Sequence, residues 1–200
     1  MTRARWFFSQ DGWLVGQRHH PSTHKNERPL NGGRPFLAVI HHISLPAGHF
    51  GGTAVDDLFM GRLVEEPPEE LSDLKGLRVS SHFFIDRHGV LTQYVSLKDR
   101  AWHAGVSWFE GRDNCNDFSI GIELEGTGFC PYTAQQYKTL IKLLRTLRRA
   151  GCLEAVTGHE MIAPGRKTDP GPSFDWWRIR QALPSTVRFV LKPQRTSQGL

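Results

Sequence analysis

Two stretches of the chain have the apolar patterns of β-strands. Apolar residues run without a break from Phe36 to Ile40 and include β-branched members, which predicts a buried central strand. The later segment FSIGIELEG, residues 118–126, alternates instead. Alternation places successive side chains on opposite faces of a strand. We therefore expect one face made of Phe118, Ile120, Ile122 and Leu124, and a second face made of Ser119, Gly121, Glu123 and Glu125.

The segment YTAQQYKTLIKLLRTLRRAG, residues 132–151, has the pattern of an amphipathic helix. Thr133 and Gln136 are spaced as a capping box at its start, and Gly151 can end it after two arginines in the last turn. Its apolar stripe recurs at helical spacing and is expected to face the core rather than a cofactor. The stripe consists of Tyr137, Leu140, Ile141, Leu144 and Leu147.

Shorter patterns complete the prediction. Residues 54–63 fit a short helix, and residues 83–87 and 90–95 fit a hairpin with its turn at His88-Gly89. A short strand is expected before His159, and DWWRIRQAL forms a last helix that Pro184 stops. The acidic, proline-rich residues 64–76 lack periodicity and are expected to form an exposed loop or flap. Strands and helices interleave, so the fold class is α/β (α+β) around one sheet.

The length of 200 residues suits one compact domain. We expect this domain to span residues 36–184. The preceding residues 1–35 include a polar stretch rich in Pro, Gly and His and are expected to form an irregular arm. Residues 185–200 are expected to form a frayed tail.

Charge and composition narrow the classes of function. The net charge of +5 is spread without a basic run, so nucleic-acid binding is not expected, although a small anionic substrate would be attracted. The three cysteines lack a C-x-x-C pair, which favours free thiols in a reducing compartment. The first apolar run is too short for a signal peptide, and no later run could span a membrane. These features predict a soluble cytoplasmic protein.

Candidate metal ligands lie far apart in the chain. His159 and Asp169 belong to the segment GHEMIAPGRKTDPGPSFDWW, residues 158–177, whose prolines and glycines can fold it back and hold side chains in fixed geometry. With His41, at the end of the first strand, they would form two imidazoles and one carboxylate. Such a set leaves a fourth position open on zinc. The spacing alone leaves the alternative open that His41 is an ordinary hydrogen-bonded histidine.

Glu123 and Lys167 each have two interpretations. Glu123, on the polar face of its strand, is either a solvent-facing carboxylate or a general base for a zinc-bound water. Lys167, two residues before Asp169, is either a solvated loop lysine or a cation that stabilises an oxyanion. Glu125 fits the solvent-facing interpretation.

Several motifs together resemble one family. The segments VIHHISLPAGHFGG, RVSSHFFIDRHGVLTQYV, RAWHAGVS, CNDFSIGIELEGT and TGHEMIAPGRKTDPGPSFDW run in order from about Val39 to Trp176 and resemble the AmpD-type N-acetylmuramoyl-L-alanine amidases. The resemblance implies a central mixed sheet flanked by helices, with a Zn²⁺ site at one side. By motif position, the zinc ligands are His41, His159 and Asp169, the general base is Glu123, and Lys167 stabilises the oxyanion.

The family's reaction is cleavage of the amide between the lactyl group of N-acetylmuramic acid and L-alanine, preferably with the 1,6-anhydro sugar, in cytoplasmic cell-wall recycling. The resemblance implies a small-molecule muropeptide substrate and no obligate protein partner. Arg78 and Arg112 match family arginines near the site and are expected to meet substrate carboxylates. Trp102 is expected to offer an apolar wall, with Trp108 a second candidate, unless both are core aromatics. The sequence departs from the family pattern at His42, where Asn is expected to contact substrate.

Three alternatives compete with this hypothesis. The first is a binding module, because some peptidoglycan-recognition proteins have this fold without zinc; the complete ligand set with Glu123 and Lys167 argues against it. The second is a secreted autolysin, which would need an export signal. The third is a basic nucleic-acid binder, which salt-sensitive DNA binding would reveal.

Overall fold

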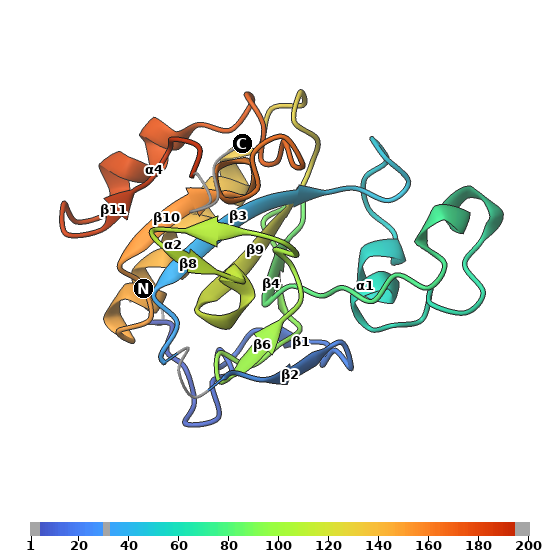
Figure 1. The fold of residues 1–200 in the computed structure, drawn as a ribbon, viewed down its shortest axis with the longest axis horizontal. Helices are drawn as coiled ribbons and strands as arrows, with labels where there is room; N and C mark the ends of the chain where they lie inside the picture. The colour runs from blue at the N-terminus through green and yellow to red at the C-terminus, as the bar shows by residue number, and fades with distance from the viewer. Residues whose placement is uncertain (1–4, 30–32, 195–200) are drawn as a thin grey trace.

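The computed structural model describes residues 5–29 and 33–194 and is built around a seven-stranded sheet (Figure 1). The strand order is β1-β5-β4-β9-β3-β10-β11, and among these neighbours only β4 and β5 are antiparallel. The predicted mixed sheet is therefore confirmed. Its strands are β1 (Arg18–His19), β3 (Leu37–Ile43), β4 (Phe83–Ile85), β5 (Leu91–Gln93), β9 (Ser119–Glu125), β10 (Ala155–Gly158) and β11 (Arg188–Phe189).

Smaller elements surround the sheet. Two-stranded ladders join β2 (Lys25–Glu27) to β6 (Asp99–Ala101) and β7 (Trp108–Phe109) to β8 (Arg112–Asp113). The helices are α1 (Ala54–Phe59), α2 (Ala134–Arg149), α3 (His159–Ile162) and α4 (Trp176–Ala182), with 3₁₀ turns η2 (Glu69–Leu74) and η3 (Cys115–Asp117). In Figure 1, α1 and the segment after it project from one side of the sheet. Within the described ranges, no helix is long and apolar enough to cross a bilayer.

The longest helix covers one face of the central strands. The capping box of α2 is present, because Thr133 Oγ1 accepts from the N–H of Gln136 at 3.1 Å and Gln136 Oε1 accepts from the N–H of Thr133 at 3.0 Å. The predicted stripe is buried except for Ile141, and Leu143 joins it. It packs against the apolar face of β9, formed by Ile120, Ile122 and Leu124.

The opposite face of the sheet holds the polar side of β9. Here Leu37 and Val39 of β3 pack with Ala104, Phe109 and Ile162, which come from loops, β7 and α3. Phe118 also packs in this cluster, so its predicted place on the face of Ile120 is wrong. The reason is that Phe118 is the C-cap of η3 and precedes the regular alternation, which begins at Ser119.

Several sequence predictions about irregular segments are wrong. Residues 18–19 and 25–27 form β1 and β2, and residues 188–189 form β11, because each finds a neighbouring strand with which to pair. Part of the predicted flap forms η2 and buries Leu71. The first strand extends to Ile43, so His41 lies inside it, because β9 offers pairing partners as far as Glu125. The predicted arm and tail also include residues 1–4, 30–32 and 195–200, which lie outside the described residues.

Arg28 ties the N-terminal segment to the body of the protein. Its guanidinium donates to the carbonyl oxygens of Leu97, Asn116, Asp117 and Ser119 at 2.9–3.1 Å. Burial lowers the pKa of Arg28 to about 10, and at neutral pH the group remains charged. The cation is thus held by main-chain dipoles at the start of β9.

Candidate metal centre and active site

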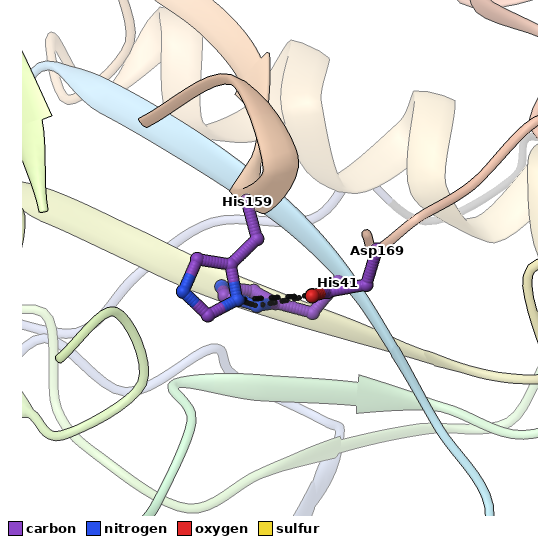
Figure 2. Close-up of side chains that lie close together, drawn as sticks. All are labelled: His41, His159 and Asp169. Carbon is purple, nitrogen blue, oxygen red and sulfur yellow. Dashed lines mark hydrogen bonds and ion pairs between the residues drawn. The ribbon is translucent and has the colours of Figure 1, made fainter. Parts of the chain in front are cut away.

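Sheet register brings His41 and His159 together. In β3, His41 pairs with Glu123 of β9 on one side. On the other side, Ile40 pairs with Gly158, the last residue of β10, and His159 follows directly as the first residue of α3. Asp169 enters from the loop after α3, as Figure 2 shows. The three side chains that the sequence assigned to one site therefore converge from three segments.

The three donor atoms form a tight triangle. Nδ1 of His41 lies 3.0 Å from Nδ1 of His159 and 2.9 Å from Oδ2 of Asp169, and the last two atoms are 3.1 Å apart. Hydrogen bonds alone do not satisfy all three contacts, because two N–H groups that both pointed at the carboxylate would also face each other. A tetrahedral zinc ion keeps its donors roughly 3.3 Å apart, as its ligand distances of about 2.0–2.2 Å require. The buried group therefore fits a metal ion.

The charges in the group suit metal binding. Burial and the neighbouring His159 lower the pKa of His41 to about 4, so its imidazole is neutral at physiological pH. Burial alone would raise the pKa of Asp169, but hydrogen bonds from His159 and His41 outweigh it and lower that pKa well below its usual range. A lone pair on His41 and an ionised carboxylate on Asp169 are the forms that bind a cation.

Glu123 lies beside the triangle and is buried, so the solvent-facing interpretation is wrong. Its Oε1 atom lies 4.0 Å from Nδ1 of His41, and among the described residues its Oε2 atom has no hydrogen-bond partner. Burial, together with the charge of Asp169, raises the pKa of Glu123 well above its ordinary value, against the opposing charge of Lys167. A buried carboxylate without a partner is costly and is characteristic of functional sites.

Glu125, two residues further along β9, is also buried, which corrects its predicted exposure. Its carboxylate accepts from the backbone N–H of Gly51 and, at 2.9 Å, from that of Arg87. Both donors lie far away in the sequence, on the loops that follow β3 and β4. Glu125 therefore joins two loops at the end of the sheet, and its role is structural.

Lys167 is exposed on the loop between α3 and Asp169. Its charge lowers the pKa of both His41 and Glu123, so the ammonium lies within electrostatic reach of the donor triangle. In the described part of the chain, no hydrogen bond or ion pair joins the side chain of Lys167 to another residue. The side chain is thus available to a ligand.

His42 points to the other side of β3 from His41, as adjacent residues in a strand do. It lines a pocket of about 390 Å³ together with Thr127, Phe129 and Thr168. Thr168 precedes the ligand Asp169, and Phe129 is 87% exposed. The pocket therefore adjoins the loop that carries the candidate ligand Asp169. Burial lowers the pKa of His42, which is a neutral donor or acceptor at physiological pH.

The structure separates the other predicted substrate residues. Arg78 is exposed. Trp102 is half-buried, stacks on His24 with ring centroids 6.0 Å apart, and donates from Nε1 to Asn26 at 2.7 Å. Arg112 stacks on Phe118 at 4.1 Å, beside the start of β3 and β9. His41 lies about 13 Å further along the sheet, four residues beyond the first residue of β3. Arg112 is therefore held against Phe118, near the start of β9.

One residue that contacts the candidate metal ligand His41 was not assigned from the sequence. His103 lies between Trp102 and Ala104, and its Nδ1 atom is 2.9 Å from Nε2 of His41. It is the second residue after the end of β6 and lies outside any strand, so no periodicity marks it. Its presence within the RAWHAGVS motif was the only sequence signal.

Comparison with known proteins places these features in a family. A family model described as N-acetylmuramoyl-L-alanine amidase matches residues 31–172. The chain is 50% identical over 173 residues to the 1,6-anhydro-N-acetylmuramyl-L-alanine amidase AmpD of Escherichia coli (strain K12), across 86% of this chain and 94% of that protein. It is 45% identical over 177 residues to the AmpD of Haemophilus influenzae, across 87% and 96% of the two chains.

Solved structures have the same fold. The crystal structure of a Se-Met AmpD derivative matches with a TM-score of 0.83 at 47% identity, across 89% of this chain and all of that one (100%). The amidase AmiD from E. coli, solved as a complex with the substrate anhydro-N-acetylmuramic acid-L-Ala-D-gamma-Glu-L-Lys, matches with a TM-score of 0.57 at 27% identity, across 88% and 65% of the two chains.

The fold and the sequence matches define the class: this chain belongs to the N-acetylmuramoyl-L-alanine amidase family. Within that family it is of the AmpD type, as its motifs predicted. The predicted fold class, a mixed sheet with flanking helices, is confirmed by the same matches.

Proposed function

We propose that this protein is a zinc-dependent amidase. Its reaction is hydrolysis of the amide between the lactyl group of (1,6-anhydro)-N-acetylmuramic acid and the L-alanine of muropeptides. The names of its AmpD relatives and the substrate bound to AmiD support this choice. The observation that carries the proposal is the pairing of three converging metal donors with a buried, unpartnered Glu123.

A protein that only binds peptidoglycan fragments would not need this arrangement. Leaving a buried carboxylate oxygen without a partner costs about 1–3 kcal/mol. Buried carboxylates of this kind are typical of sites where the group donates or accepts a proton in catalysis. The same position in a binding module could hold an amide or an apolar side chain at no such cost. Glu123 therefore favours catalysis over recognition alone.

Each residue of the site has a distinct task in the proposed reaction. His41, His159 and Asp169 would hold the zinc ion, which would act as a Lewis acid and lower the pKa of a bound water. Glu123 accepts the proton of the attacking water and delivers it to the nitrogen of the leaving alanine. Lys167 stabilises the negative charge that develops on the lactyl carbonyl oxygen. The sheet fixes Glu123 relative to His41, so little reorganisation is needed.

Substrate recognition is proposed for Arg78, Trp102 and the pocket beside His42. Arg78 is free to meet a peptide carboxylate, and Trp102 offers a flat apolar surface held by Asn26. The pocket beside His42 has the exposed ring of Phe129 and the hydroxyls of Thr127 and Thr168. His42 takes the place proposed for a hydrogen-bonding asparagine in this family.

The proposed setting is cell-wall recycling in the cytoplasm. Cys115, Cys130 and Cys152 are all free thiols, as is usual in a reducing compartment. The relatives are named for the 1,6-anhydro sugar, which fits a substrate that has already been released from the wall. No obligate protein partner enters the proposal.

One assay tests the whole proposal. Purified protein is analysed for zinc, and release of the alanine-linked peptide from anhydro-muramyl peptide is followed with and without a chelator. We expect one zinc per chain, activity that the chelator abolishes, and recovery when zinc is restored. Full activity in protein stripped of metal, or no peptide release at any zinc occupancy, would refute it.

A further inference from the structure

His103 and Ala104 contact the two candidate histidine ligands on the side of each ring that faces away from the donor triangle. Nε2 of His41 lies 2.9 Å from Nδ1 of His103, and Nε2 of His159 lies 3.0 Å from the carbonyl oxygen of Ala104. In each ring, the nitrogen that contacts this dipeptide is the one that does not belong to the donor triangle. The dipeptide is therefore placed to set the orientation of both imidazoles.

The dipeptide is itself fixed by contacts with three other segments. Asn116 Oδ1 accepts from the backbone N–H of His103 at 3.1 Å and of Ala104 at 2.8 Å. Arg166 donates to the carbonyl oxygen of Ala104 at 2.6 Å. The ring of His103 lies against Gly121, where an added Cβ would come within 2.5 Å of its Cγ atom. These contacts leave little freedom to the segment.

Hydrogen-bond chemistry fixes the direction of each contact. A carbonyl oxygen only accepts, so Nε2 of His159 carries the proton and its Nδ1 lone pair faces the triangle. For His41 to present Nδ1 in the same way, its Nε2–H must donate to Nδ1 of His103. The proton of His103 is then on Nε2, which lies 3.2 Å from Oγ of Ser119. Every donor in this chain has an acceptor.

We propose that His103 is a positioning residue for the metal centre. It accepts the Nε2–H of His41 and thereby holds the tautomer and ring orientation that direct Nδ1 at the metal. The inference rests on the proposed function, because it concerns the same metal site. Outer-sphere partners of metal-binding histidines typically contribute about 10–100-fold in metal affinity, which sets the expected size of the effect.

Two substitutions separate positioning from space filling. Asn has a carbonyl oxygen near the place of the imidazole Nδ1 atom, so His103→Asn keeps the acceptor, whereas His103→Leu keeps the volume and removes it. Zinc affinity is measured by competition with a chromophoric chelator. We expect His103→Leu to weaken zinc binding about 10–100-fold and His103→Asn to stay close to the wild type. Equal affinities, or the reverse order, would overturn the inference.

A measurement on the unmodified protein guards against misfolded variants. In the zinc-loaded wild type, ¹⁵N NMR should find His41 protonated at Nε2 and coordinated through Nδ1; coordination through Nε2 would contradict the assignment. His88→Asn, in the exposed β4–β5 turn, serves as the matched control and should leave zinc affinity unchanged. If the wild type binds no zinc, the proposed function fails; if it binds zinc and His103→Leu binds as tightly, only the role of His103 fails.

Discussion

Nδ1 of His41 and Oε1 of Glu123 lie 4.0 Å apart on neighbouring strands, where the two residues are direct partners in the ladder. The strand pairing that builds the sheet therefore also sets the distance between a candidate metal ligand and a candidate base. The second oxygen of that carboxylate has no partner among the residues described. An acceptor with a raised pKa is thus held in place before any substrate arrives.

The catalytic roles predict variants that keep the metal and lose the reaction. Glu123→Gln removes the proton acceptor, and Lys167→Ala removes the oxyanion-stabilising charge. We expect each to lower kcat by at least about 10²-fold, the lower limit for general bases and oxyanion donors, with zinc content unchanged. Steady-state kinetics and metal analysis on the same samples check this. Full activity in either variant would refute the role of that residue.

The raised pKa of Glu123 predicts how stability depends on pH in metal-free protein. Because the folded state holds this proton more tightly than the unfolded state does, Glu123 contributes stability below its unfolded pKa of about 4.3, and that contribution is lost as the pH rises toward the folded pKa. Gln does not titrate. We therefore expect the Tm of Glu123→Gln relative to wild type to increase from pH 4 upward. A difference in Tm that is constant or shrinks with pH would contradict the assignment.

Metal ligation predicts the effect of removing one imidazole. His41→Ala leaves two donors, which cannot match the affinity of three, so the purified variant should lack stoichiometric zinc and be inactive. Elemental analysis measures the metal directly. His49→Ala is a suitable control, because this exposed histidine lies in the loop after β3 and outside the donor triangle. Full zinc occupancy in His41→Ala would argue against ligation.

The two arginines carried over from the family pattern should behave differently. Arg78 is exposed, so Arg78→Ala should raise KM for the muropeptide and leave the Tm unchanged. Arg112 stacks on Phe118, so Arg112→Ala should lower stability by about 0.5–2 kcal/mol through the lost cation–π contact and leave KM unchanged. Denaturant titration and kinetics on both variants test the pair. A raised KM in Arg112→Ala would show instead that Arg112 binds substrate.

Gly121 should not tolerate a side chain. A Cβ at this position would come within 2.5 Å of His103 Cγ, and overpacking of this kind costs about 1–3 kcal/mol. We expect Gly121→Ala to lower both the free energy of unfolding and the zinc affinity. Gly128→Ala is the matched control, since its nearest contacts are at 3.6 Å. Equal behaviour of the two variants would show that the ring of His103 moves freely.

The sequence predicted what depends on local periodicity and motif. The alternation in β9 placed Glu123 on the polar face, and the capping box located the start of α2 to within a residue. The motifs also named the three donors that the fold brings together. Each of these signals lies within a few residues of the feature that it predicts.

What the sequence could not predict depends on distant segments. Glu125 is buried because the N–H groups of Gly51 and Arg87 meet it from loops 74 and 38 residues away. The edge strands β1 and β11 have two residues each, too few to show a period. The contact of His103 with His41 could not be predicted, because the two residues are 62 positions apart in the sequence.

The candidate donors His41 and Asp169 are separated by 128 residues. The proposed metal site can therefore form only after most of the chain has been synthesised. In the proposed zinc site, a nascent chain has no high-affinity ligand set until Asp169 has left the ribosome and β10 has docked beside β3. Zinc uptake is therefore expected to be a late step in maturation, and it stabilises the folded chain by mass action.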